Sequence, residues 1–91
     1  MTVLNWPYKD PNEVLDYVVD WSDRLDGDVV SISTWTIPPG ITHDSDSFTP
    51  TATTIWLSDG TIGASYTFVN RVVTAGGRTM DQSIKLKIKE K

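Results

Sequence analysis

Apolar and polar residues alternate along most of this chain, in short runs separated by turn residues. Residues 15–21, Leu-Asp-Tyr-Val-Val-Asp-Trp, show the pattern clearly, with every odd position apolar. In an extended strand, successive side chains point to opposite faces, so this alternation indicates a half-buried strand. Strands are expected at residues 3–6, 15–21, 29–37, 41–48, 53–57, 65–74 and 79–88. About seven short strands without helical periodicity predict an all-β sandwich of antiparallel strands.

Glycine and proline mark where these runs stop. Asp26-Gly27-Asp28 forms one turn, Pro38-Pro39-Gly40 ends the third strand, and Ala75-Gly76-Gly77-Arg78 supplies the residues of a tight hairpin. The only helical signal is a single turn at Pro11-Asn12-Glu13. The chain reads as one domain over residues 1–91, with residues 1–10 as an N-terminal arm or a short edge strand.

The sixth predicted strand carries the pattern of a tyrosine corner. Tyr66 follows a tight turn and stands two residues before Phe68, an arrangement in which the phenol hydroxyl bonds the backbone of the preceding loop. Trp35 lies mid-strand, where immunoglobulin-like sandwiches place a core tryptophan. We therefore expect an immunoglobulin-like core built on Tyr17, Trp21, Trp35, Tyr66 and Phe68. These rings should pack against Val19, Ile55, Leu57, Val72, Ile84 and Leu86.

Composition limits the chemistry that the chain can carry. It has no cysteine, so no disulfide can hold the sandwich, and packing alone must do so. Such a chain can fold in a reducing cytosol, and we expect it to be made in the cytoplasm. The N-terminus lacks a basic region followed by an apolar run, and no apolar stretch approaches the roughly 20 residues of a membrane span. We expect neither a signal peptide nor membrane insertion.

Charge is distributed unevenly along the sequence. Residues 1–46 hold nine acids and two bases, whereas residues 47–91 hold three acids and six bases. This acidic balance argues against nucleic acid as a partner. Near the C-terminus Lys85, Lys87, Lys89 and Lys91 alternate with apolar residues, so a strand would send all four ammonium groups to one face. The stripe either protects an edge strand against pairing or docks on an acidic neighbour.

Two groups of aromatic residues are candidates for contact with a partner. Alternation turns Trp56 outward between Ile55 and Leu57, and exposed tryptophan is enriched at interface centres. The other interpretation places its ring under a loop or a long side chain. Trp6 and Tyr8 flank Pro7 near the N-terminus, where they either dock on a partner or cap the open end of the sandwich. The cap is the favoured interpretation. Candidate interface residues are Trp6, Tyr8, Trp56, Lys85, Lys87 and Lys89.

No catalytic or cofactor-binding pattern stands out. The only histidine, His43, lies in a polar run, and the sequence has no Gly-x-Ser-x-Gly elbow and no phosphate-binding loop. Residues 23–28 lack the ligand spacing of an EF-hand, and His43, Asp44 and Asp46 fall on alternating sides of a strand. Both acidic clusters are best explained as solvated turns. We expect no enzyme activity, no metal and no cofactor.

Several strings of residues together resemble a known family. They are residues 8–17, Val19-Asp20-Trp21, residues 33–38 with Gly40, Trp56-Leu57, residues 63–66 and Gly77-Arg78-Thr79. In this order they resemble the small immunoglobulin-like, fibre-like structural proteins encoded among the head and tail genes of tailed bacteriophages. The resemblance covers about residues 8–88, and the family has no catalytic residues that could be transferred to this chain.

The resemblance implies a virion structural or accessory protein, present in many copies, with other virion proteins of the capsid or tail as its partners. The leading hypothesis is a non-enzymatic decoration protein on the capsid surface. The alternative is a carbohydrate-binding or host-adhesion module of the tail or fibre, which would stack a host-surface glycan on Trp56 or Trp6. A homo-oligomer is a further candidate assembly.

Overall fold

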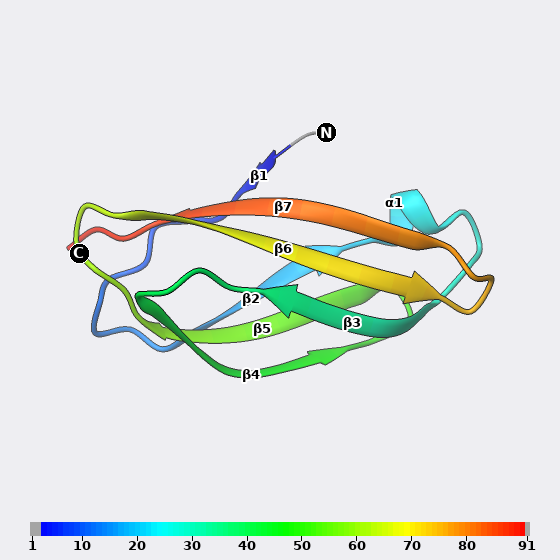
Figure 1. Cartoon of the computed structure of the whole chain (residues 1–91), viewed down its shortest axis with the longest axis horizontal. Helices are drawn as coiled ribbons and strands as arrows, with labels where there is room; N and C mark the ends of the chain where they lie inside the picture. The colour runs from blue at the N-terminus through cyan, green and yellow to red at the C-terminus, as the bar shows by residue number, and fades with distance from the viewer. Residues whose placement is uncertain (1–2, 91) are drawn as a thin grey trace.

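The chain folds into two stacked β-sheets that form a sandwich (Figure 1). This computed structural model describes residues 3–90. The strands are β1 (Val3–Asn5), β2 (Leu15–Asp20), β3 (Val30–Thr36), β4 (Ile41–Phe48), β5 (Ala52–Asp59), β6 (Ser65–Thr74) and β7 (Thr79–Lys87). One sheet has the order β1-β7-β6-β3 and the other the order β2-β5-β4. The all-β sandwich predicted from alternation is confirmed.

Six strands are divided between the sheets as in an immunoglobulin-like sandwich, with β2, β5 and β4 in one sheet and β3, β6 and β7 in the other, whereas β1 lies beside β7 and not beside β2. The first strand departs from the prediction of a uniformly antiparallel fold. β1 pairs with β7 in parallel, from Val3 opposite Ser83 to Asn5 opposite Lys85. The expectation of antiparallel pairing was therefore wrong for β1. Alternation indicates which face a side chain lies on, but it contains no information on strand direction.

A second difference is a short helix, α1 (Ser22–Leu25), between β2 and β3. It ends at Asp26, which has a left-handed backbone with a φ of 48°. Four residues are too few to show helical periodicity, so the sequence revealed only the turn that follows the helix. Leu25 is buried, which anchors this connection to one end of the core.

The core lies between the sheets and is made by the inward residues of their strands. Tyr17, Trp21, Tyr66 and Phe68 are all buried. The aliphatic residues expected around them are buried as well, namely Val19, Ile55, Leu57, Val72, Ile84 and Leu86. Trp35 is half-buried rather than enclosed, because β3 is the last strand of its sheet; its ring packs against both parts of the core.

A buried polar cluster links the two sheets. Asn70 on β6 accepts hydrogen bonds at Oδ1 from the Trp21 indole N–H (3.0 Å) and the Thr53 hydroxyl (2.7 Å). Its amide group donates to the Ser33 hydroxyl (3.1 Å) and to the Thr34 carbonyl (3.2 Å). Every polar group of Asn70 thus has a partner, which is the condition under which burying an amide does not cost stability.

The tyrosine corner has the geometry that the sequence predicts. The Tyr66 hydroxyl accepts a hydrogen bond from the Thr61 backbone N–H (3.0 Å) and donates one to the Gly40 carbonyl (3.3 Å). Gly40 has a φ of 98°, and a Cβ atom there would lie 3.1 Å from the Tyr66 hydroxyl. The corner therefore joins the β5–β6 loop to the connection between β3 and β4, which crosses from one sheet to the other.

Within the described residues 3–90, no helix has the length and apolar character needed to cross a membrane.

Candidate docking surfaces

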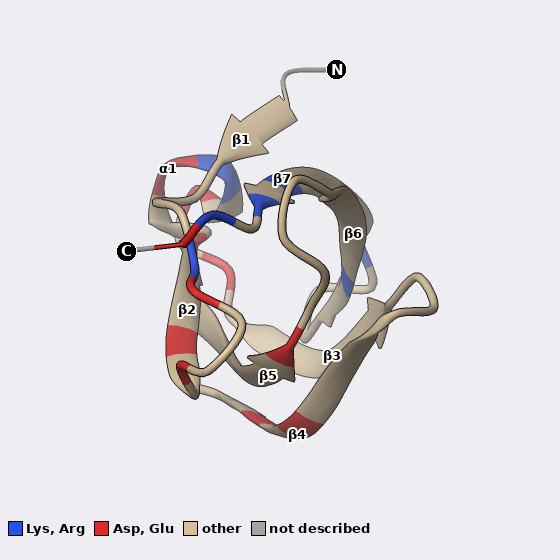
Figure 2. Cartoon of the chain, turned by 90° about the vertical axis from the view of Figure 1, so that its left-hand side faces the viewer, with Lys and Arg blue, Asp and Glu red and all other residues tan. Residues whose placement is uncertain are grey.

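The two sheets differ in the charges that their strands carry. The strands of the β2-β5-β4 sheet contain no lysine or arginine. They contain five carboxylates, on Asp16, Asp20, Asp44, Asp46 and Asp59. Figure 2 shows the red acidic positions on β2, β4 and β5. We call this sheet the acidic sheet.

The other sheet has the opposite balance. Its strands contain Lys85, Lys87 and Arg71 and a single carboxylate, Asp81. Arg71 forms a two-pronged ion pair with Asp81, at 2.8 Å and 3.0 Å, and this pair holds the pKa of Asp81 below its usual range. The pair is internally neutral, so Lys85 and Lys87 supply the net charge of this sheet, which we call the basic sheet.

The lysine stripe occupies an inner strand rather than an edge. β7 lies between β1 and β6, so the interpretation of these lysines as protection for an edge strand was wrong. That position depends on the parallel pairing of β1, which local sequence does not reveal. Lys85, Lys87 and Lys89 are exposed, whereas the alternating residues Leu86 and Ile88 are buried. Lys91, the fourth member of the predicted stripe, lies outside the described residues.

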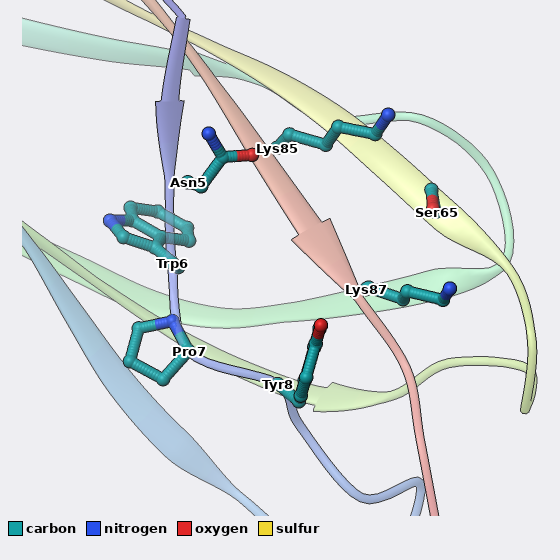
Figure 3. Close-up of a pocket in the computed structure, with 7 residues that line it drawn as sticks. All are labelled: Asn5, Trp6, Pro7, Tyr8, Ser65, Lys85 and Lys87. Atoms are coloured by element: carbon teal, nitrogen blue, oxygen red, sulfur yellow. The ribbon is translucent and has the colours of Figure 1, made fainter.

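Beside the stripe, the N-terminal segment and β7 form a surface hollow of about 520 Å³ (Figure 3). It is lined by Asn5, Trp6, Pro7, Tyr8, Ser65, Lys85 and Lys87. Figure 3 shows the two lysine side chains extended on the same side of β7, toward Ser65 on β6. Among the described residues neither lysine forms an ion pair. The hollow therefore presents two ammonium groups that a partner's carboxylates can bind.

Tyr8 forms one wall of the hollow and keeps 49% of its surface exposed. The ammonium group of Lys89 lies 4.3 Å from the centre of its ring, a distance typical of a cation–π contact. Tyr8 is thus held in place while its ring remains accessible. The structure places both residues at the same surface as Lys87.

Trp6 points the other way, into the mouth of the sandwich. Its ring stacks on Tyr17 at a centroid distance of 4.6 Å and lies 5.8 Å from Phe68 and 6.0 Å from Trp35. This is the position that a cap would occupy, although part of Trp6 also lines the hollow. Stacking fixes the N-terminal segment against the core and so positions the neighbouring Tyr8.

Lys9 fastens the same segment and was not identified from the sequence as a functional or core residue. Its side chain is fully buried, and its ammonium group donates to the carbonyls of Asp59 (2.7 Å) and Asp10 (2.9 Å). Burial lowers the pKa of Lys9, and the nearby carboxylate of Asp59 partly opposes that shift. The bond to Asp59 joins residues 50 positions apart, so no local pattern could have predicted it.

The acidic sheet carries an exposed tryptophan at its centre. Trp56 on β5 is 41% exposed, and in register it lies between Asp16 on β2 and Ser45 on β4. Val18, on the same outer face, is also exposed. The structure thus turns Trp56 outward, as alternation predicts, with an acidic residue beside it.

The two acidic clusters considered as cation sites are engaged in other ways. Nε2 of His43 lies 2.7 Å from Oδ2 of Asp46, and Asp28 accepts hydrogen bonds from the backbone N–H groups of Val29 and Gly76. In the described part of the chain, no three His, Asp or Glu side chains are arranged to hold a metal ion. The strongest chemical features of this surface are charge and exposed aromatic rings, which suit recognition of another macromolecule.

The comparisons with known proteins agree with a role in a virion. Residues 9–87 match the model of the Gp77 family, described as podophage GP4 fiber-tail adaptor protein gp77. No curated protein matches the chain.

The match supports the predicted phage structural protein but not the head decoration that was our leading hypothesis. The family description concerns the tail and its fibre, so the tail alternative fits better. Sequence reasoning could not make this choice, because the features that it found, a rigid sandwich with exposed charge and aromatic residues, suit a capsid or a tail equally. Since the match spans most of the chain, the protein belongs to the Gp77 family of podophage fiber-tail adaptor proteins.

Proposed function

We propose that this protein is a non-enzymatic adaptor of a phage tail that binds two different virion proteins through opposite faces of its sandwich. An adaptor needs two separate binding surfaces held at a fixed distance and angle. The observation that supports this proposal most strongly is the opposite charge of the two sheets. The strands of one contain no lysine or arginine and turn Asp16 and Asp20 outward, whereas the other turns Lys85 and Lys87 outward, and neither lysine has an ion-pair partner among the described residues.

Electrostatic complementarity explains why such a division is useful. Opposite charges attract the correct partner, while like charges placed across an interface reject the wrong one. The basic sheet, with Tyr8, Lys85 and Lys87, would bind an acidic surface. The acidic sheet, with Trp56 and Asp16, would bind a basic or apolar one. The adaptor would then be inserted between its neighbours in only one orientation.

The rigid interior supports this role. Asn70 ties the two sheets together through hydrogen bonds, and Tyr66 fixes the connection that crosses between them. A sandwich without long loops transmits position from one face to the other with little internal movement. We assign Trp56 to protein contact rather than to sugar stacking, because Phe48, the other exposed aromatic residue on the strands of the acidic sheet, lies opposite the inward-facing Thr53 and not on the outer face with Trp56.

Charge reversal on each face tests the proposal. In a phage that lacks the gene, the chain would be supplied as Lys85→Glu with Lys87→Glu, or as Asp16→Lys with Asp20→Lys. Purified particles would then be analysed by quantitative mass spectrometry for the adaptor and its neighbours. We expect each double variant to weaken attachment to one neighbour, with at least about a tenfold loss in the assembled particle.

The conservative variant Lys85→Arg with Lys87→Arg serves as the matched control and should assemble normally. All four positions are exposed, so each variant should fold, which circular dichroism would verify. If both double variants release the same neighbour, or if neither changes the particle, the two-face proposal is wrong. Loss of a capsid protein rather than a tail protein would contradict the adaptor role itself.

A further inference from the structure

The edges of the two sheets are not equally protected against pairing with another chain. Unpaired edge strands attract foreign strands, and proteins discourage this with charge, bulges or short length. β1 has only three residues. β2 carries Asp16 and Asp20 on its exposed side. Both edges therefore have one of the usual forms of protection.

β4 is protected in two ways. Its register with β5 shifts between His43 and Ser45, so Asp44 is an extra residue that bulges from the ladder. His43 and Asp46 consequently fall opposite Leu57 and Ile55, whose side chains point into the core. A charged side chain on the inward face of an edge strand, such as that of Asp46, is a recognised obstacle to further pairing.

β3 lacks these protective features over most of its length. It has seven residues, none charged and none proline, and its only irregularity lies between Val30 and Ile32. From Ile32 to Thr36 it pairs regularly with β6 on one side and with no strand on the other. Ile32 is 54% exposed, and Thr34 and Thr36 are exposed on the same face. β-Branched residues on one face of a strand pack well against the side chains of a strand paired beside it.

The neighbouring edge indicates what kind of segment fits. β3 and β4 lie at the same margin of the sandwich, without a hydrogen-bonded ladder between them (Figure 2). A strand added to β3 would lie at this margin beside β4, which carries Asp44 and, on its inward side, Asp46. Its inward side chains would therefore meet negative charge. Charge complementarity favours lysine or arginine at those positions.

We propose that Ile32–Thr36 of β3 receives an extended segment of another virion protein as an added strand, with β-branched residues on its outer face and basic residues facing β4. The source of the segment rests on the proposed function, whereas the pairing itself does not. A second copy of this chain fits less well, because two-fold pairing of β3 with itself would bring two acidic β4 strands together.

A peptide titration tests the pairing without any virion. The full chain, labelled with ¹⁵N, would be titrated with Val-Lys-Thr-Lys-Val-Lys-Thr and, as the matched probe, with Val-Glu-Thr-Glu-Val-Glu-Thr. We expect the lysine peptide to shift the amide signals of residues 32–36 and to slow their hydrogen exchange. The glutamate peptide should bind at least about tenfold more weakly.

Two exposed positions provide the variant and its control. Ile32→Lys replaces a β-branched residue on the face where the peptide's valine and threonine would lie, and an edge lysine discourages strand pairing, so it should weaken binding of the lysine peptide about tenfold. Val18→Lys makes the same change on the outer face of the acidic sheet and should leave binding to β3 unchanged. Neither side chain is buried, so both variants should fold.

Three outcomes would overturn the proposal: no shift at residues 32–36, equal binding of the two peptides, or shifts centred on another edge. Concentration-dependent shifts of the same amides without peptide would assign the edge to a second copy instead. Charge reversal in particles and peptide binding in solution are separate measurements. Strand addition at β3 can therefore be contradicted while the two-face adaptor is supported, and the two-face adaptor can be contradicted while strand addition is supported.

Discussion

The acidic and basic sheets have similar inner faces and opposite outer ones. Inside, Tyr17, Ile55 and Leu57 of the acidic sheet meet Phe68 and Leu86 of the basic sheet in one continuous apolar contact. Outside, one sheet carries carboxylates around Trp56 and the other carries lysines beside Tyr8. The fold needs only the inner similarity. The apolar contact between the sheets does not require the outer difference in charge, so we interpret that difference as the part of the sequence that specifies binding.

Lys9 connects the two surfaces that differ in charge, because its ammonium group bonds the N-terminal segment, which lines the hollow, to Asp59 of the acidic sheet. We expect the largest effect on stability at this residue. Lys9→Ala removes a fully buried side chain and its hydrogen bonds to the carbonyls of Asp59 and Asp10. We expect a loss of about 3 kcal/mol in the free energy of unfolding, measured with urea. Lys87→Ala, exposed on the same sheet, should change it by less than about 0.5 kcal/mol. Equal losses in the two variants would show that burial of Lys9 contributes nothing.

A smaller effect is expected at the corner that connects the two sheets. Tyr66→Phe keeps the ring but removes the hydroxyl that bonds Thr61 and Gly40. We expect the free energy of unfolding to fall by about 1–2 kcal/mol. Tyr8→Phe is the control, because the hydroxyl of this exposed residue is not part of the corner, and it should have little effect. If both variants unfold at the same urea concentration, the corner does not stabilise the crossing between the sheets.

The smallest effect is expected at Tyr17, and it has the opposite sign. Its buried hydroxyl has no hydrogen-bond partner, and burial, with smaller contributions from Glu13 and Asp16, raises its pKa to about 12. Tyr17→Phe should therefore stabilise the protein at neutral pH by up to about 1 kcal/mol. A lower melting temperature for this variant at pH 7 would contradict that expectation.

The same tyrosine predicts a dependence on alkaline pH. Between its ordinary pKa of 10.0 and its folded value of about 12, the unfolded chain loses the Tyr17 proton before the folded one does. The contribution of Tyr17 to stability is therefore complete below pH 10 and falls as the pH rises toward 12. The stability advantage of Tyr17→Phe over the parent should widen across this range. A constant difference would show that the phenol titrates alike in both states.

Features set by local sequence were predictable, and those that depend on pairing between distant segments were not. Residues 41–48 and 65–74 form strands with the expected bounds because alternation acts within a single strand. The tyrosine corner was predictable because Tyr66 reaches Thr61, only five residues away. In contrast, β7 became an inner strand through parallel pairing with β1, at the other end of the chain.

The candidate site shows the same division. The alternation of Lys85 and Lys87 placed them on one face correctly, and Trp56 was correctly turned outward. The burial of Lys9 and the bulge at Asp44 were not predicted, because each depends on pairing with a distant strand that the local sequence does not reveal. Which face meets which virion protein depends on surfaces that are not part of this chain.

The most direct test of the two-face account is site-specific cross-linking in assembled particles. A photoreactive residue would replace Trp56 on the acidic sheet or Lys87 on the basic sheet, and the cross-linked proteins would be identified by mass spectrometry. The account predicts two different tail-associated proteins, one for each position. Cross-links from both positions to the same protein, or to a capsid protein, would contradict it.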